Sequence, residues 1–268
     1  MNIISLKNVN LKYQEKDIFE DLNVEIKEGD FITIIGENAS GKTSLVKILL
    51  GLVEAQGEII IDGMKMTPES RRNIISKIGV VFENPDDQFL TGTVREELAF
   101  PLENMKVSKE EISARIDQIS EFTNIKDILD REPHTLSGGE KQLVSLSTAL
   151  IINPKILILD ESLSMIDNFY REKIYKILKK LNEKNKMTII NVTHDIEEVI
   201  YGKSILILSK GKIIDYSSTR KVLQNGKQLE SLGLDIPFMV DLSNKLKYYD
   251  LVDKMYLNMK DMVDDLWK

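Results

Sequence analysis

GENASGKT, residues 36–43, is the stretch of sequence that decides the fold, because it fits the pattern G-x-x-x-x-G-K-[ST]. A continuous apolar run, residues 31–35, precedes it and suits a buried strand. Residues 43–50 follow with the apolar spacing of a helix. In this context the loop wraps phosphate with backbone N–H groups, and the helix N-terminus adds positive potential. The alternative is a fortuitous glycine-rich turn before a helix.

Two side chains of this loop carry the expected chemistry. Lys42 is expected to neutralise charge on the β- and γ-phosphates of a nucleotide and so to act in catalysis. Thr43 is expected to offer its hydroxyl to Mg²⁺. The residues predicted to bind nucleotide in this part of the chain are Gly36, Glu37, Asn38, Ala39, Ser40, Gly41, Lys42, Thr43 and Ser44.

A second candidate site begins with the apolar run ILIL, residues 156–159, which ends in Asp160 and Glu161. The run predicts a central buried strand, and ligands of open α/β sheets bind at the carboxyl ends of such strands. Asp160 is expected to hold Mg²⁺ through water, and Glu161 to act as general base on the attacking water. The alternative is a strand that leaves the core with two acids at the surface.

The composition is that of an ordinary globular protein, since 42% of the 268 residues are hydrophobic and 29% are charged. The lack of cysteine excludes disulfides and a thiolate metal site, and the only histidines are His134 and His194. The net charge of −7 argues against a general nucleic-acid face. The apolar runs are strand-sized and the N-terminus has no signal-peptide pattern. We therefore expect a cytoplasmic protein that meets a membrane only through a partner.

Strand and helix patterns divide the chain into three parts. Strands are predicted early and late, helices in the middle, and an amphipathic helical tail from about residue 220. The predicted strands are 3–9, 22–26, 31–35, 58–62, 156–159 and 188–192, with a hairpin over 204–215, and the predicted helices are 43–50, 109–129, 137–151, 169–182 and 197–201. Alternation of strands and helices predicts an α/β fold with parallel strands at the centre of its sheet.

LSGGEKQ, residues 136–142, resembles the LSGGQ element of ATP-binding cassette (ABC) proteins. The phosphate loop, this element and the paired acids stand in that family's order. The resemblance implies a P-loop NTPase of ABC type, which binds and hydrolyses ATP with Mg²⁺. Its expected fold is α/β, with a mixed sheet core, a helical subdomain and a C-terminal helical extension. The family role implied for the element is contact with the ATP of a partner cassette, through Ser137, Gly138, Gly139 and Glu140. A serine N-cap before a Gly-Gly helix start is the other interpretation, and it is compatible with that role.

Three further elements resemble parts of the same family. His194, after the predicted strand 188–192, resembles the switch histidine near the γ-phosphate and is predicted to be catalytic. SMID, residues 164–167, resembles the D-loop that links two active sites, so Asp167 is predicted to contact nucleotide; a helix N-cap is the alternative. Tyr13 resembles the aromatic residue that stacks on adenine, and an ordinary strand tyrosine is the alternative.

VFENPDDQF, residues 81–89, resembles the Q-loop of energy-coupling factor ATPases, and LGLDIPF, residues 232–238, resembles their C-terminal region. In that family two cassettes drive a membrane module that imports vitamins or metal ions such as cobalt and nickel. The resemblance implies three partners: a second cassette, identical or different, an integral membrane coupling subunit and a substrate-binding membrane subunit, with no nucleic acid. It places the chain at the cytoplasmic face of the cell membrane, as a peripheral subunit.

Four positions depart from the family pattern. Glu83 stands where the family has glutamine, and it could ligate Mg²⁺ directly or slow hydrolysis. Ala39 replaces a usual glycine, which costs about 1 kcal/mol or more if the position needs a positive φ. Glu140 replaces the last glutamine of LSGGQ, a mild change, and Leu143 replaces a frequent arginine. A low-turnover ATP-binding half of a heterodimer is therefore one alternative function, and a soluble cassette that acts on ribosomes or DNA is another.

The expected domain boundaries follow from these patterns. An ATP-binding core, RecA-like with an antiparallel β part, is expected over residues 1–85 and 152–219, the helical subdomain with LSGGE over 86–151, and a C-terminal helical extension for dimerisation over 220–268. The tail must pack on something, either the cassette's own flank or the partner's tail through Phe238, Leu242 and Leu246. A chain that ends near Thr219 is expected to stay folded.

Overall fold

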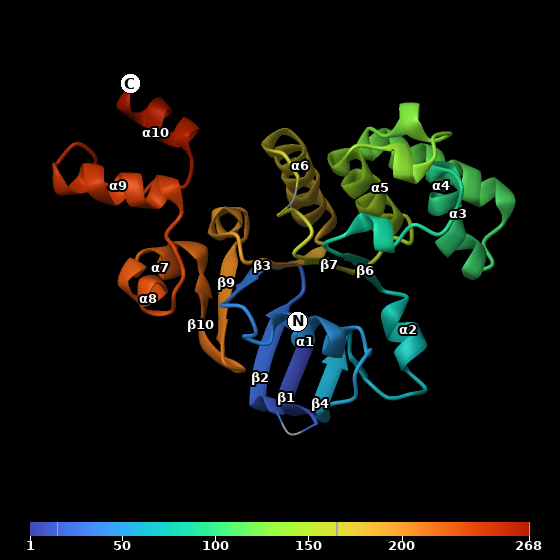
Figure 1. The fold of residues 1–268 in the computed structure, drawn as a ribbon, viewed down its shortest axis with the longest axis horizontal. Coiled ribbons are helices and arrows are strands. Elements are labelled where there is room, and N and C mark those ends of the chain that lie inside the picture. The colour runs from blue at the N-terminus through green and yellow to red at the C-terminus, as the bar shows by residue number, and fades with distance from the viewer. Residues whose placement is uncertain (15, 165, 268) are drawn as a thin grey trace.

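The computed structural model describes residues 1–14, 16–164 and 166–267 (Figure 1). Within these residues the larger sheet has six strands in the order β10-β9-β3-β8-β7-β6. They are β3 (Phe31–Ile35), β6 (Ile78–Val81), β7 (Ile156–Asp160), β8 (Thr188–Val192), β9 (Ser204–Ser209) and β10 (Lys212–Ser218). All neighbours are parallel except β10, which pairs antiparallel with β9. The predicted α/β fold, with parallel strands at the sheet centre and a hairpin over 204–215, is confirmed.

A second sheet is antiparallel, in the order β2-β1-β4-β5. Its strands are β1 (Asn2–Tyr13), β2 (Lys16–Lys27), β4 (Gln56–Ile61) and β5 (Met64–Lys65), and β1, β2 and β4 lie in the lower half of Figure 1. One hydrophobic cluster joins Ile26 and Ile61 of this sheet, Ile158 of the larger sheet and Ile48 of helix α1 (Lys42–Leu49). The helix that follows the phosphate loop is therefore fixed by the apolar core that both sheets share.

Helices between β6 and β7 form a lobe to one side of the larger sheet (green in Figure 1). The lobe contains α3 (Val94–Asn104), α4 (Lys109–Thr123) and α5 (Gly138–Leu150), with 3₁₀ turns at Pro85–Asp87, Lys126–Ile128 and Pro133–Thr135, and α2 (Arg71–Ile75) precedes it. The predicted helix over 109–129 was too long, because Asn124 ends α4 with a left-handed φ of 59°. Helix α3 was not predicted, since Pro101 interrupts its sequence pattern, although Thr93 and Glu96 form a capping box at its start.

Two helical elements come directly before and after β8 in the chain. Helix α6 (Asn168–Asn185) confirms the helix predicted over 169–182. The segment after His194, predicted to be helical over 197–201, is a 3₁₀ helix, Ile196–Tyr201. Its Glu198 side chain is buried and accepts a hydrogen bond from Asn191 Nδ2 of β8 at 2.9 Å. Burial raises the pKa of the Glu198 carboxyl. This buried contact ties the segment after His194 to the sheet.

The tail consists of four short helices: α7 (Thr219–Leu223), α8 (Gly226–Ser231), α9 (Phe238–Tyr248) and α10 (Met259–Leu266). Val222, Leu223, Leu229 and Val240 share a buried cluster with Ile35, Ile205 and Ile207 of the larger sheet. The first half of the tail therefore packs on the cassette's own flank. Leu242 and Leu246 pack on a second cluster within the tail. Of the three residues expected to contact the partner's tail, only Phe238 is largely exposed. A chain that ends near Thr219 would lose these contacts and uncover one flank of the sheet, so its predicted folding would come with a loss of stability.

Replacement of Leu223 by alanine should therefore destabilise the whole cassette. Leu223 is fully buried against the larger sheet, so we expect Leu223→Ala to lower the free energy of unfolding by about 2–5 kcal/mol. Leu251→Ala is the matched control, since Leu251 is 61% exposed in the same tail. Denaturant unfolding of both variants, followed by circular dichroism, is the measurement. Equal and small effects of the two substitutions would contradict the packing of the tail on the sheet.

Candidate functional site

The phosphate loop leaves β3, all of whose residues are buried, and enters α1. Gly36 allows the loop to turn against β9, because a Cβ atom there would lie 2.0 Å from the Leu208 carbonyl oxygen. Lys42 folds its side chain back into the loop, and its Nζ donates to the carbonyl oxygens of Gly36 at 2.8 Å and Glu37 at 3.2 Å. Ala39 has a φ of 61°, so the position does need a positive φ. Alanine there carries the expected strain of about 1 kcal/mol.

Lys42 also connects the loop to the second candidate site. Its side chain is 5% exposed, and its Nζ lies 3.9 Å from Glu161 Oε1. Burial lowers the pKa of the Lys42 ammonium, and the negative charges of Glu161 and Asp160 offset part of that effect. The other Glu161 oxygen, Oε2, lies 3.1 Å from Nδ1 of His194. The three residues predicted to be catalytic thus lie together, at the ends of adjacent parallel strands.

The backbone holds Glu161 in an unusual conformation. Its φ is 52°, although it has a side chain, and its N–H donates to the Val192 carbonyl oxygen of β8 at 2.8 Å. A left-handed non-glycine residue costs about 1–3 kcal/mol and is typical of functional sites. In that conformation the Glu161 carboxylate lies near both Lys42 and His194.

A cavity of about 690 Å³ opens beside these groups. Its lining consists of Thr43, Phe82, Glu83, Asn84, Asp87, Gln88, Asp160 and Glu161. Burial raises the pKa of Asp160 to about 6, with further contributions from the charges of Glu161 and Glu83. Asp160 Oδ1 is buried and has no hydrogen-bond partner among the described residues. An orphaned carboxylate oxygen, a threonine hydroxyl and three more carboxylates on one cavity fit a hard divalent cation.

Helix α5 holds the segment that contains Glu83 in place. Lys141 Nζ forms an ion pair with Asp86 at 2.7 Å, Gln142 Nε2 donates to the Phe82 carbonyl oxygen at 3.3 Å, and the Ser145 hydroxyl donates to the Gln88 side chain. Sequence reasoning did not identify these contacts. The signal that could have pointed to them is a run of polar residues on the face of α5 that otherwise packs against the sheet.

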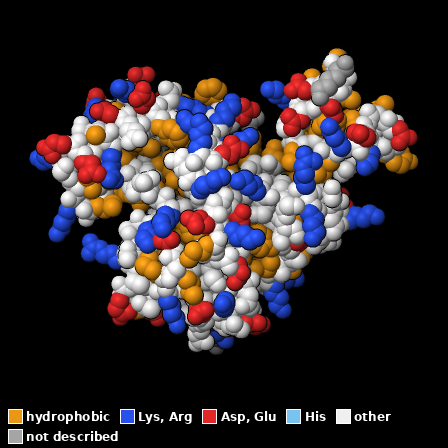
Figure 2. All heavy atoms as spheres, turned by 180° about the vertical axis from the view of Figure 1, so that it is seen from behind, with side chains coloured by type: hydrophobic (Ala, Val, Ile, Leu, Met, Phe, Trp, Pro, Cys, Tyr) orange, Lys and Arg blue, Asp and Glu red, His pale blue; other side chains and the backbone are white. Residues whose placement is uncertain are grey.

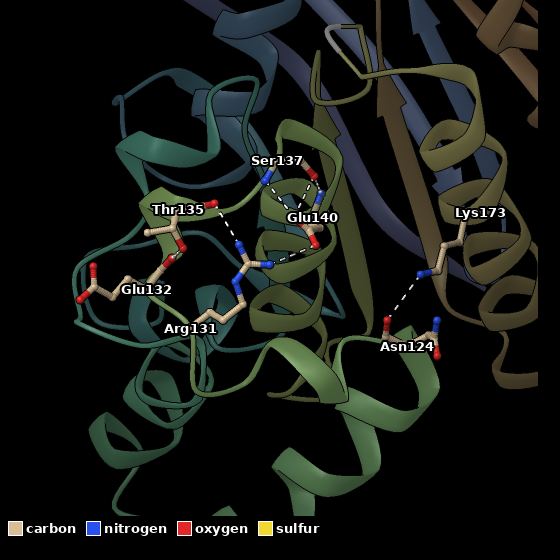
Figure 3. Close-up of polar contacts among 7 residues, drawn as sticks. All are labelled: Asn124, Arg131, Glu132, Thr135, Ser137, Glu140 and Lys173. Atoms are coloured by element: carbon tan, nitrogen blue, oxygen red, sulfur yellow. Dashed lines mark hydrogen bonds and ion pairs between the residues drawn. The ribbon is translucent and has the colours of Figure 1, made fainter.

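LSGGE begins α5, and Ser137 is its N-cap (Figure 3). Ser137 Oγ accepts from the Glu140 N–H at 3.4 Å, while Glu140 Oε2 accepts from the Ser137 N–H at 2.8 Å. The N-cap interpretation is therefore confirmed. A Cβ on Gly139 would lie 2.2 Å from the Tyr170 ring, whereas a Cβ on Gly138 would meet no atom within 4 Å. The helix start is thus packed against α6 at Gly139 and open at Gly138.

The remaining predicted residues do not line the cavity of Glu83 and Asp160. Asp167 is the N-cap of α6, and its Oδ1 accepts from the Tyr170 N–H at 3.1 Å, which confirms the N-cap alternative. Met165 of the D-loop resemblance lies outside the described residues. Tyr13 ends β1 and is 39% exposed. Phe19, which pairs with Leu11 near that end of β1, packs against the phosphate loop at Gly41.

Two arginines of the site region were also missed. Arg171 Nη1 bonds Asp195 Oδ2 at 2.8 Å, directly after His194, and Arg131 Nη1 lies 3.5 Å from Glu140 Oε1. Both pairs join residues from different elements, so neither pair leaves a local spacing in the sequence. Only the fold brings these charges together.

Comparison with known proteins identifies the family. A family model described as ABC transporter matches residues 19–164. The chain is 38% identical to the energy-coupling factor transporter ATP-binding protein EcfA1 of Streptococcus thermophilus (strain CNRZ 1066), over 99% of this chain and 98% of that protein. It is 37% identical to EcfA1 of Oenococcus oeni, over 100% of this chain and 98% of that protein.

Solved structures agree. The structure of cbiO1 from Clostridium perfringens, part of the ABC transporter complex cbiONQ, matches with a TM-score of 0.80 and 26% identity, over 94% of this chain and 99% of that one. The dimeric ATP-binding cassette MJ0796, bound to ADP and Pi, matches with a TM-score of 0.73 and 32% identity, over 81% and 99%. The chain belongs to the ABC transporter family, among its energy-coupling factor ATP-binding proteins.

Proposed function

We propose that this chain is the ATP-hydrolysing subunit of an energy-coupling factor importer and binds MgATP as one half of a two-cassette sandwich. The observation that carries the proposal is the position of Lys42. Its buried ammonium lies within the phosphate loop and 3.9 Å from the Glu161 carboxylate, so phosphate-binding and water-activating groups meet at one point. EcfA1, similar over nearly its whole length, is named as an energy-coupling factor transporter ATP-binding protein.

The residues that would hold Mg²⁺ are Thr43, Asp160 and Glu83. The buried, unpartnered Asp160 Oδ1 supports this assignment, and Thr43 and Glu83 line the same cavity. When bound, the ion would polarise the β- and γ-phosphates and balance their charge. Glu83 would give the site one more negative charge than the glutamine that the family pattern has here.

The chemistry proposed for the side chains is in-line transfer of the γ-phosphoryl group to water. Glu161 accepts a proton from the water while the water oxygen bonds to the γ-phosphorus, and the bond from that phosphorus to the ADP oxygen breaks. His194 Nδ1 lies 3.1 Å from Glu161 Oε2, so the imidazole is proposed to orient that carboxylate. Lys42 balances the charge of the β- and γ-oxygens, and the products are ADP and phosphate.

The proposed function assigns a second set of donors for the γ-phosphate to a partner cassette. The start of α5 is capped by Ser137 and open at Gly138, and its N–H groups suit an anion. We infer that these residues complete the ATP site of a second cassette, identical or different, and that Asp167 lies near that interface. Tyr13 is proposed to stack on adenine.

The membrane part of the transporter is proposed to come from other chains. In the portion of the chain that the structure covers, no helix has the length and apolar character that a bilayer crossing requires. The proposed partners are an integral coupling subunit and a substrate-binding membrane subunit, with this chain at the cytoplasmic face of the membrane. The proposed divisions of the chain are residues 1–85 with 152–219 as ATP-binding core, 86–151 as helical subdomain and 220–268 as C-terminal extension.

The end of the tail is proposed to contact the partner cassette. Met259, Val263 and Leu266 follow helical spacing and form an exposed apolar stripe on α10. Figure 2 shows hydrophobic side chains among charged ones on the lobe at the upper right, which is the end of the tail. This stripe takes the place of the Leu242 and Leu246 contact that the sequence suggested.

Glu161→Gln should keep ATP binding and nearly abolish hydrolysis, because an amide cannot accept the proton of the water. We expect ATP turnover to fall by about 10²–10⁴-fold, the range for general-base catalysis. Glu172→Gln is the control, since Glu172 is exposed on α6 and forms an ion pair with Lys176 at 3.6 Å, away from the cavity. Phosphate release and nucleotide binding are measured on both variants. Turnover at the parent rate in Glu161→Gln would remove Glu161 from the role of base.

The pKa of Asp160 should fall when Glu83 loses its charge. The pKa of Asp160 is raised to about 6, partly by the negative charge of Glu83, so Glu83→Gln should lower it. Carboxyl NMR on the nucleotide-free protein measures the titration, and Glu132→Gln is the control at a distant acid. An unchanged or higher pKa of Asp160 would mean that Glu83 does not share this site.

A double substitution on α10 tests the tail contact. Val263→Asp with Leu266→Asp places two charges on the exposed stripe and should lower the mass measured without nucleotide to that of one cassette. Lys260→Asp is the control, since it adds an acid to the same helix outside the stripe. Light scattering reports the mass. If the double variant keeps the mass of the parent dimer, the stripe is not the contact.

A further inference from the structure

Glu140 lies at the start of α5 with its carboxylate turned back over the LSGGE element (Figure 3). Glu140 Oε2 accepts from the Ser137 N–H at 2.8 Å and from the Ser137 hydroxyl at 2.9 Å. Both donors of Ser137 are therefore taken by one carboxylate oxygen. The proposed function assigns Ser137 to the γ-phosphate of the ATP that the partner cassette binds.

The charge of this group matters more than its shape. A glutamine at position 140 would present a neutral oxygen to the same two donors, because the amide and the carboxylate have nearly the same size. The carboxylate binds them as a charge-assisted acceptor, and its pKa is lowered chiefly by the Ser137 backbone N–H. It also repels an arriving phosphate. The sequence interpretation of Glu140 as a mild change was therefore incomplete.

Arg131 offers the carboxylate a second place to bind. Its Nη1 lies 3.5 Å from Glu140 Oε1, and its Nη2 donates to the Thr135 carbonyl oxygen at 3.0 Å, so the guanidinium is anchored beside the helix start (Figure 3). Lys173 of α6 is a second cation on this side; its Nζ donates to the Asn124 carbonyl oxygen at 3.4 Å. A small rotation of the Glu140 side chain would break its hydrogen bonds to Ser137 and bring its carboxylate closer to the Arg131 guanidinium.

We propose that the Glu140 carboxylate is an internal anion that competes with the γ-phosphate of the partner cassette's ATP for Ser137, and that Arg131 draws it aside when the phosphate arrives. Glu140 and Arg131 are then positioning residues that set how tightly ATP joins the two cassettes. This inference rests on the proposed function, because it needs a second cassette that presents its ATP to Ser137.

A purely structural role for Glu140 predicts the opposite effect. Glu140 completes a capping box and places a negative charge at a helix N-terminus, so its neutralisation should weaken α5 slightly. A weakened helix start would bind the partner's ATP less well. The internal anion predicts tighter association in spite of that loss. The direction of the change therefore separates the two roles.

The test measures ATP-dependent association of the full chain with its partner cassette, whether a second copy or a different chain, in the slowly hydrolysing Glu161→Gln background. Glu140→Gln should lower the dissociation constant by about tenfold, the size of a charge-assisted hydrogen bond. Glu132→Gln is the matched control. It removes the same charge from the loop before α5, but its carboxylate contacts the exposed His134 ring at 3.0 Å and not Ser137. Analytical ultracentrifugation with MgATP gives the dissociation constants.

Arg131→Gln completes the experiment. It should weaken association when Glu140 is present and have a smaller effect in Glu140→Gln, because the arginine acts through the carboxylate. Equal tightening by Glu140→Gln and Glu132→Gln, no tightening by Glu140→Gln, or additive effects of Arg131→Gln would each overturn this inference and leave the proposed function intact. Failure of every variant, the parent included, to associate in MgATP would overturn both.

Discussion

The structure depends on one buried ammonium. Lys42 leaves the start of α1 and enters the space where the loops after β3 and β7 meet, and it is satisfied there by two loop carbonyl oxygens and a carboxylate. A buried lysine without such partners would carry a large desolvation penalty. The parallel sheet brings the loops together, since β3 and β7 both pair with β8 and end at the same edge. The core that the two sheets share with α1 thus decides where the charge of the site lies.

Around that one cation the site is acidic. Asp160 and Glu161 end one strand, Glu83 follows the neighbouring one, and an anionic nucleotide would add further negative charge. Burial raises the pKa of Asp160 to about 6, and the charges of Glu161 and Glu83 add to that effect. The proposed divalent ion would offset this negative charge. Glu140 adds a negative charge at the other proposed half of the ATP site. Two positions where the family pattern has glutamine carry glutamate here, so both faces of a composite site would depend on counter-charge.

The sequence predicted the central strands, and it marked the polar groups at their ends as a candidate site, because both leave local signals. Residues 31–35 and 156–159 are strand-length apolar runs, and the loop after each carries the polar groups of the site. The limits of α4 and α3 could not be found in the same way. Asn124 ends α4 by adopting a left-handed φ, and Pro101 interrupts the helical sequence pattern of α3. Contacts between distant elements, such as Arg131 with Glu140 or Leu223 with the sheet, depend on the folded chain and leave no spacing to read. The tail shows this most clearly. The sequence correctly indicated that its apolar residues must pack, but their partners could be assigned only from the folded chain.

A structure of the Glu161→Gln chain with its partner cassette, ATP and Mg²⁺ would test the central claim most directly. We predict that the triphosphate lies along residues 36–43, that the ion lies between Thr43 and Asp160, and that Ser137 of the opposite cassette reaches the γ-phosphate. Nucleotide bound elsewhere, an ion remote from Asp160, or a γ-phosphate contacted by Ser137 of the same chain would contradict the composite site.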